Sequence, residues 1–83
     1  MLELSPGNYL VNGAFRSFDN AEKLSDDLFQ RGYHDIKVGY VTASGYYYVV
    51  VNMAANMNAA QSEAKRLRDR PGFEKTWVLS VDK

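Results

Sequence analysis

The sequence predicts an α+β fold with the order βαββαβ, in which a four-stranded antiparallel sheet carries two helices on one face. Three observations support this prediction. Residues 46–51 join three tyrosines to three valines, which is the strongest strand signal in the chain. Two segments with apolar residues at helical spacing separate the predicted strands. The two halves of the chain also repeat one another in the order of their motifs.

Four apolar segments are expected to form the strands. They are residues 9–15, 36–42, 46–51 and 76–81. The short connection at residues 43–45 predicts an antiparallel hairpin between the second strand and the third. Right-handed crossovers in two βαβ units place the first and third strands in the centre, which gives the spatial order 4-1-3-2. This arrangement is the ferredoxin-like sandwich.

Each of the two predicted helices starts at a capping signal. Asp19 and Glu22 have the spacing of a capping box, for a helix that ends near Arg31. Asn58 repeats the signal in the second half, for a helix that ends near Pro71. Both helices carry one apolar stripe, so both are expected to cover the same face of the sheet.

The third strand is expected to have two apolar faces, because side chains alternate along a strand. Tyr47, Val49 and Val51 are expected to face the helices. The opposite face is expected to be bare and available to a partner. On this interpretation the ring of Tyr48 points away from the core, so Tyr48→Ala should weaken ligand binding and leave stability nearly unchanged.

One polar residue conflicts with this alternation. Asn12 falls on the helix-facing side of the first strand. We expect either a bulge near Gly13 that turns Asn12 outward or a buried amide whose hydrogen bonds are satisfied.

Composition excludes several classes of function. Ten basic residues balance ten acidic ones in the 83-residue chain, so no overall field attracts nucleic acid or anionic membranes. The absence of cysteine excludes disulfides and thiolate chemistry. No segment has the length of a transmembrane helix, and residues 1–7 lack the apolar run of a signal peptide. We expect the chain to be a domain excised from a longer protein.

No catalytic or metal-binding arrangement is evident, and we expect a non-enzyme without a cofactor. His34 is the only histidine and has no second ligand at metal spacing. Asp26 and Asp27 are adjacent on a predicted helix, so they point about 100° apart and do not form an acid–base pair.

Several motifs, in order, resemble the SPOR (sporulation-related repeat) domain family. They are Tyr9-Leu10-Val11-Asn12-Gly13-Ala14-Phe15, Asn20-Ala21-Glu22-Lys23-Leu24, Gly32-Tyr33, Tyr47-Tyr48-Val49-Val50-Val51 and Gly72-Phe73-Glu74-Lys75-Thr76-Trp77-Val78-Leu79. The resemblance covers residues 9–81. It implies one SPOR-like domain over residues 1–83, with tandem βαβ repeats at about 9–42 and 46–81.

The resemblance implies a non-catalytic module of the bacterial periplasm or cell envelope that binds peptidoglycan. The implied ligand is the glycan strand, preferably stripped of stem peptides, bound on the open face of the sheet. Division sites are the implied location, with other cell-division or envelope proteins as further partners.

Strand alternation and the family positions together give the expected ligand-binding residues. These are Tyr9, Val11, Arg16, Lys37, Tyr46, Tyr48, Val50 and Val78, with Val41, Thr76 and Ser80 beside them. Tyrosine suits a glycan because its flat ring meets C–H groups and its hydroxyl forms hydrogen bonds. Val11 replaces a glutamine frequent in the family, Arg16 the usual serine and Tyr48 a common arginine. Asn52-Met53-Ala54 also departs from the family pattern, which has a second Gly-small-Phe there.

Two alternatives use the same face. It could bind another protein or a second copy of the chain. The βαββαβ order and residues 45–51 also echo RNA-recognition domains, but Ser44 and Tyr47 replace the basic and small residues of that motif. Because the neutral charge also removes the phosphate contribution to affinity, we expect no nucleic-acid partner.

Overall fold

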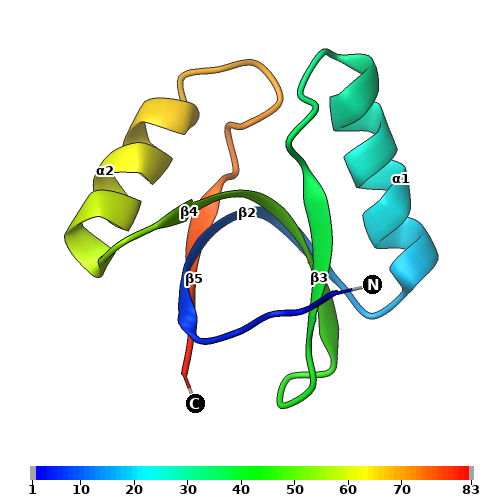
Figure 1. The fold of residues 1–83 in the computed structure, drawn as a ribbon. Helices are drawn as coiled ribbons and strands as arrows, with labels where there is room; N and C mark the ends of the chain where they lie inside the picture. The colour runs from blue at the N-terminus through cyan, green and yellow to red at the C-terminus, as the bar shows by residue number, and fades with distance from the viewer. Residues whose placement is uncertain (1, 83) are drawn as a thin grey trace.

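The computed structural model describes residues 2–82 and shows one curved sheet with two helices on its convex side (Figure 1). Its elements are β1 (Leu2–Glu3), β2 (Gly7–Phe15), α1 (Phe18–Gln30), β3 (Lys37–Val41), β4 (Tyr46–Ala54), α2 (Met57–Leu67) and β5 (Trp77–Val81). The strand order is β1-β3-β4-β2-β5. The four predicted strands are β2, β3, β4 and β5, and each is antiparallel to its neighbours among them. Their order in the sheet, β3-β4-β2-β5, is the predicted order 4-1-3-2 read from the opposite edge, so the ferredoxin-like fold is confirmed. The sequence did not predict β1, which pairs parallel to β3.

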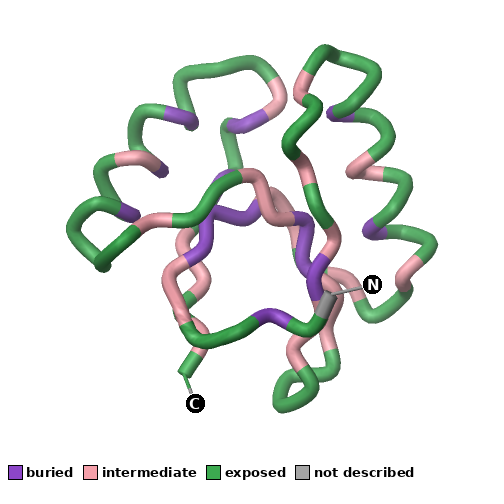
Figure 2. The backbone as a smooth tube through the Cα atoms, viewed as in Figure 1, coloured by how far each residue is buried: buried purple, intermediate pink, exposed green. Residues whose placement is uncertain are grey.

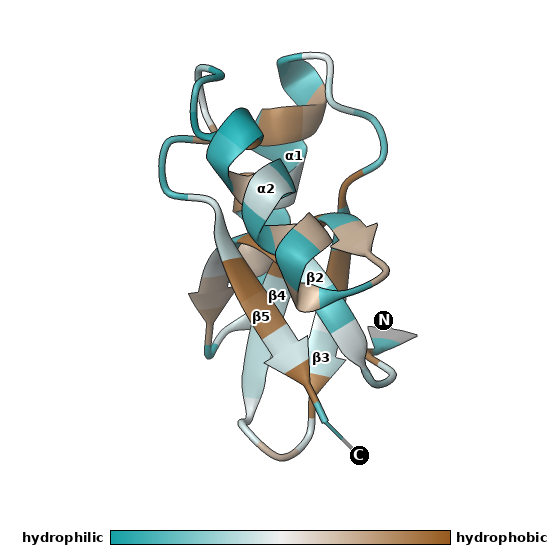
Figure 3. Ribbon diagram, turned by 90° about the vertical axis from the view of Figure 1, so that its left-hand side faces the viewer, coloured by the Kyte–Doolittle hydropathy of each residue, from teal (hydrophilic) through white to brown (hydrophobic). Residues whose placement is uncertain are grey.

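The helices and the sheet enclose the main core. Its buried members come from β2, β4, both helices and the loop before β5: Leu10, Ala21, Leu28, Val49, Ala60, Ala64, Leu67 and Phe73. Seen from the side, the two helices form one layer above the sheet, and the visible surface of α2 is mostly hydrophilic (Figure 3). Neither helix in the described part of the chain is long and apolar enough to cross a membrane.

The predicted orientation of β5 is wrong. Val78 lies opposite Leu10 in the β2–β5 pairing, and both side chains pack in the main core. Opposite residues on paired strands share a face, so Val78 points toward the helices and Ser80 follows the same alternation. Thr76 is also misplaced, because it is buried beneath Asn12.

Asn12 is satisfied within the structure. The pairing of β2 with β4 shifts register between Val11 and Ala14, which marks a bulge around Asn12. The Asn12 Nδ2 donates to the carbonyl oxygen of Gly72 at 3.0 Å, and its Oδ1 accepts a hydrogen bond from the Thr76 hydroxyl. The predicted bulge is present, but it does not turn Asn12 into solvent: the half-buried amide is satisfied by Gly72 and the buried Thr76.

Both helices are capped two residues before the predicted position. The Ser17 Oγ accepts a hydrogen bond from the Asn20 N–H at 3.4 Å, and the Asn56 Oδ1 accepts one from the Ala59 N–H at 2.8 Å. Phe18, the first residue of α1, packs edge-on against Tyr47, with ring centroids 5.7 Å apart. This contact brings the start of α1 onto the sheet. The second helix also ends at Leu67, before the predicted end near Pro71.

The two asparagines at the start of α2 provide a matched test of the cap. We expect Asn56→Ala to lower the free energy of unfolding by about 1 kcal/mol, because it removes the acceptor for an unpaired N–H. Asn58→Ala is the same chemical change at an exposed position inside the helix, so it should be neutral or slightly stabilising. Urea denaturation of both variants measures the difference. A larger loss for Asn58→Ala would restore the predicted cap.

Candidate binding face

The side of the sheet away from the helices carries a second set of aromatic and apolar residues. We define this open face from the strand register as Tyr9, Val11, Lys37, Val41, Tyr46, Tyr48, Val50, Trp77, Leu79 and Val81. It includes every predicted ligand-binding residue except Val78, which faces the helices, and Arg16, which follows the end of β2. Tyr9 pairs across to Leu79, and Val50 pairs across to Lys37.

The open face is not bare, and the expectation that it would be is wrong. Residues 3–6, which we call the N-terminal strap, leave the edge of the sheet beside β3 and cross this face to reach β2 (Figure 1). Figure 2 shows the buried part of the strap opposite the buried residues of the central strands. Leu4 is only 6% exposed and packs with Tyr9, Val11 and Tyr48 in a second apolar cluster.

Hydrogen bonds fix the strap on both sides of Leu4. The Leu4 N–H donates to the Tyr40 carbonyl oxygen at 2.8 Å. The Tyr9 hydroxyl donates to the Ser5 carbonyl oxygen at 2.7 Å. The Glu3 carboxylate accepts hydrogen bonds from the Thr42 hydroxyl at 2.6 Å and from the Thr42 N–H at 3.1 Å. These two bonds hold the pKa of Glu3 below its usual value, because they favour the charged carboxylate.

Gly39 makes room for the strap. It lies on the open face opposite Tyr48, and a Cβ atom at this position would overlap the Leu4 side chain. The missing side chain therefore forms a recess in β3 into which Leu4 fits.

The strap changes the environment of Tyr48. This residue is 6% exposed, and its hydroxyl donates to the Ser44 Oγ at 3.0 Å. Its ring lies between those of Tyr46 and Trp77, with centroid distances of 6.4 Å and 6.2 Å. The ring does point away from the helices, as predicted, but into the second cluster and not into solvent.

Hollows lie on the open face on either side of the strap. The larger, of about 520 Å³, is lined by Glu3, Leu4, Ser5, Tyr9, Asp35, Lys37, Val50, Val51, Asn52 and Met53. The smaller, of about 330 Å³, is lined by Val41, Ala43, Ser44, Tyr48, Leu79, Ser80, Val81 and Asp82. The structure thus brings Tyr9, Lys37 and Val50 together in one hollow and places Tyr48 in the other.

The rim of the face carries accessible rings and cations. The Arg16 guanidinium lies 5.3 Å from the centre of the half-buried Tyr46 ring, within cation–π range. Trp77 is 38% exposed and lies opposite Val11. Trp77 is not among the predicted ligand-binding residues, because the prediction gave β5 the opposite alternation. Residues 77–79 are all apolar, so alternation in the sequence carries no signal that would have identified it.

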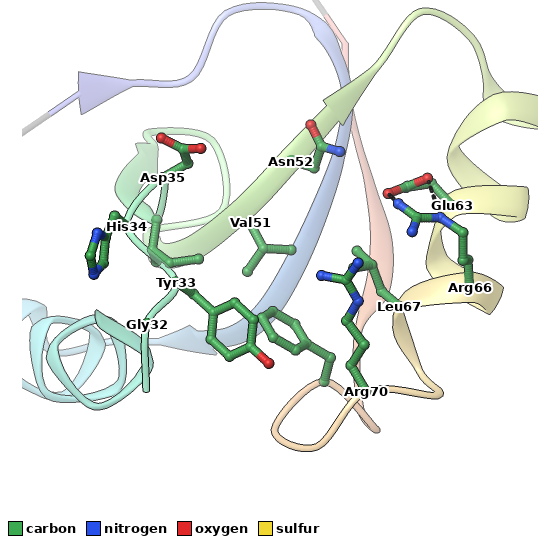
Figure 4. A pocket seen from close by; sticks show the side chains of 12 residues that line it. Gly32, Tyr33, His34, Asp35, Val51, Asn52, Glu63, Arg66, Leu67 and Arg70 are labelled. Carbon is green, nitrogen blue, oxygen red and sulfur yellow. Dashed lines mark hydrogen bonds and ion pairs between the residues drawn. The ribbon is translucent and has the colours of Figure 1, made fainter. Parts of the chain in front are cut away.

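A third hollow lies on the other side of the sheet, between the C-terminal ends of the helices, and occupies about 280 Å³ (Figure 4). None of the predicted ligand-binding residues lines it. On its α2 wall, Arg66 forms an ion pair with Glu63 and so lowers the pKa of that carboxyl. Tyr33 and Phe73 pack edge-on beneath it, with ring centroids 4.5 Å apart. Across residues 2–82 there is no cluster of three or more histidine or acidic side chains that could hold a metal ion.

A family model described as the SPOR domain matches residues 5–80. The match includes every open-face residue except Val81, but not Glu3 and Leu4, the residues that anchor the strap. No curated protein and no solved structure gives a significant match.

The burial of Tyr48 reverses the stability effect expected from sequence. We now expect Tyr48→Ala to lower the free energy of unfolding by about 3–5 kcal/mol, as for other buried aromatic residues. Tyr46→Ala is a matched control on the same strand and face, and it should cost clearly less because Tyr46 is only half-buried. Urea denaturation followed by circular dichroism measures both. Equal and small losses would show that the strap does not bury Tyr48 in solution.

Proposed function

Because this chain belongs to the SPOR domain family, whose members are non-catalytic peptidoglycan-binding modules of the cell envelope, we propose that it binds peptidoglycan glycan strands on its open face. The main supporting observation is the pairing of accessible aromatic rings with two hollows on that face. Tyrosine and tryptophan rings present flat apolar surfaces to the C–H faces of sugars, and their polar atoms bind hydroxyl groups.

The cations at the face suggest which form of the glycan is preferred. Arg16 and Lys37 are both exposed, and neither forms an ion pair within the described residues. Removal of stem peptides leaves a carboxylate on alternate sugars of the glycan strand. An exposed arginine or lysine attracts such a group, so we propose a preference for strands without stem peptides. We propose the periplasm as its environment and a role at division sites as part of the same function.

Trp77→Ala is the sharpest test of the proposed face. We expect it to reduce the association constant for glycan strands about tenfold, equivalent to about 1.4 kcal/mol, because the exposed indole ring is lost. Its free energy of unfolding should fall less than that of Tyr48→Ala, because the Trp77 ring is 38% exposed. The matched control is Phe29→Ala, which removes a 53% exposed aromatic ring from α1 on the opposite layer and should leave binding unchanged.

Isothermal titration calorimetry with glycan strands released by an amidase measures the affinities of wild type, Trp77→Ala and Phe29→Ala. The same titration with peptide-bearing peptidoglycan fragments measures the preference for strands without stem peptides. Equal affinities of Trp77→Ala and wild type for the strands would contradict the proposal. Broadening of the Trp77 indole signal with protein concentration, in the absence of glycan, would instead indicate self-association through this face.

A further inference from the structure

The strap covers the residues that the proposed function would use, and this conflict points to a conformational step. We infer that the N-terminal strap is a displaceable cover, and that a glycan strand binds the central part of the open face only when Leu4 leaves its recess over Gly39. This inference rests on the proposed function, because it concerns access to the same face.

With the strap in place, the centre of the open face is closed to a glycan strand. Tyr9 and Tyr48 are each at most 6% exposed, and Val11 is fully buried. The Tyr9 hydroxyl is already bonded to the Ser5 carbonyl. The two hollows lie on opposite sides of the strap, so a ligand longer than one hollow would have to pass through the position of Leu4.

The attachment of the strap is suited to reversible release. Within the described residues, its pairing with β3 covers Leu2 and Glu3 and is continued by one bond from the Leu4 N–H, to which the bonds of Glu3 with Thr42 and of Ser5 with Tyr9 add. Within the strap, Leu4 is the only buried residue; Glu3, Ser5 and Pro6 are exposed. Segments with few buried contacts open locally while the rest of a domain stays folded. The main core lies on the other side of the sheet and does not include the strap.

Opening of the strap would expose additional residues that can contact the ligand, as well as removing a steric block. Release of Leu4 uncovers the rings of Tyr9 and Tyr48 and frees the Tyr9 hydroxyl. These rings then extend the accessible surface already offered by Tyr46 and Trp77. The centre of the face is available only in the open fraction of molecules, so the closed strap lowers the apparent affinity for a ligand that needs the centre.

A reversible lock tests the inference. Glu3 and Tyr40 are direct partners in the β1–β3 pairing, and adjacent strands bring Cα atoms within the range that a disulfide spans. The double variant Glu3→Cys/Tyr40→Cys would contain the only cysteines in the chain. Its oxidised and reduced forms are matched controls, since they differ only in the tether. We expect the oxidised form to bind amidase-released glycan strands on the order of tenfold more weakly than the reduced form.

Two further variants open the strap by different means. Leu4→Ser removes its apolar anchor, and Gly39→Ala fills its recess. We expect both to bind more tightly than wild type, by on the order of tenfold for Leu4→Ser. Hydrogen exchange of the Leu4 amide, bonded to Tyr40 in the closed state, should accelerate when wild-type protein is saturated with glycan strands.

The outcomes separate this inference from the function on which it rests. Equal binding by the oxidised and reduced forms, or weaker binding by Leu4→Ser, would show that the strap is a fixed wall of the site and overturn the inference. Leu4 amide protection that persists at saturation would overturn it as well. If neither wild type nor Leu4→Ser binds glycan strands, the proposed function itself fails and the role of the strap fails with it.

Discussion

The structure depends on the fact that β4 is apolar on both of its faces. A central strand of this kind loses stability wherever a face remains in water, because burial of apolar area is the main favourable contribution to folding. Two helices cover Val49 and its neighbours on one side, while Leu4 covers Tyr48 on the other. The domain therefore has two apolar clusters, and the strap is as much a consequence of the β4 sequence as the helices are.

This double cover explains which parts of the fold the sequence could predict. The order of strands and helices follows from hydrophobic periodicity and from the handedness of βαβ units, both of which are local or general. The strap carries no such signal, since its one buried residue, Leu4, stands among Glu3, Ser5 and Pro6. Its position is fixed by a recess at Gly39, a residue remote in the chain, and no pattern within residues 1–8 indicates that contact.

The misassigned face of β5 has a different cause. Trp77, Val78 and Leu79 are all apolar, so alternation alone cannot decide which of them points to the core. The decision comes from the bulge in β2, where Asn12 binds the Gly72 carbonyl and the Thr76 hydroxyl and thereby fixes the chain just before β5. The predicted cap positions were also wrong because of a contact made elsewhere in the fold. The side chains of Asp19 and Asn58 fit a capping pattern, but the contact of Phe18 with Tyr47 starts α1 earlier.

A face that both stabilises the domain and binds a ligand places a limit on affinity. The free energy that a glycan strand gains by contacting Tyr9 or Tyr48 must exceed the free energy lost when Leu4 leaves those rings. Leu4 does not compete with the ligand at Trp77 or at the Arg16–Tyr46 pair, because these residues are accessible while the strap is closed. The rim is therefore suited to the first encounter and the covered centre to a second, slower step. In such a scheme Leu4 sets the strength of binding without touching the sugar.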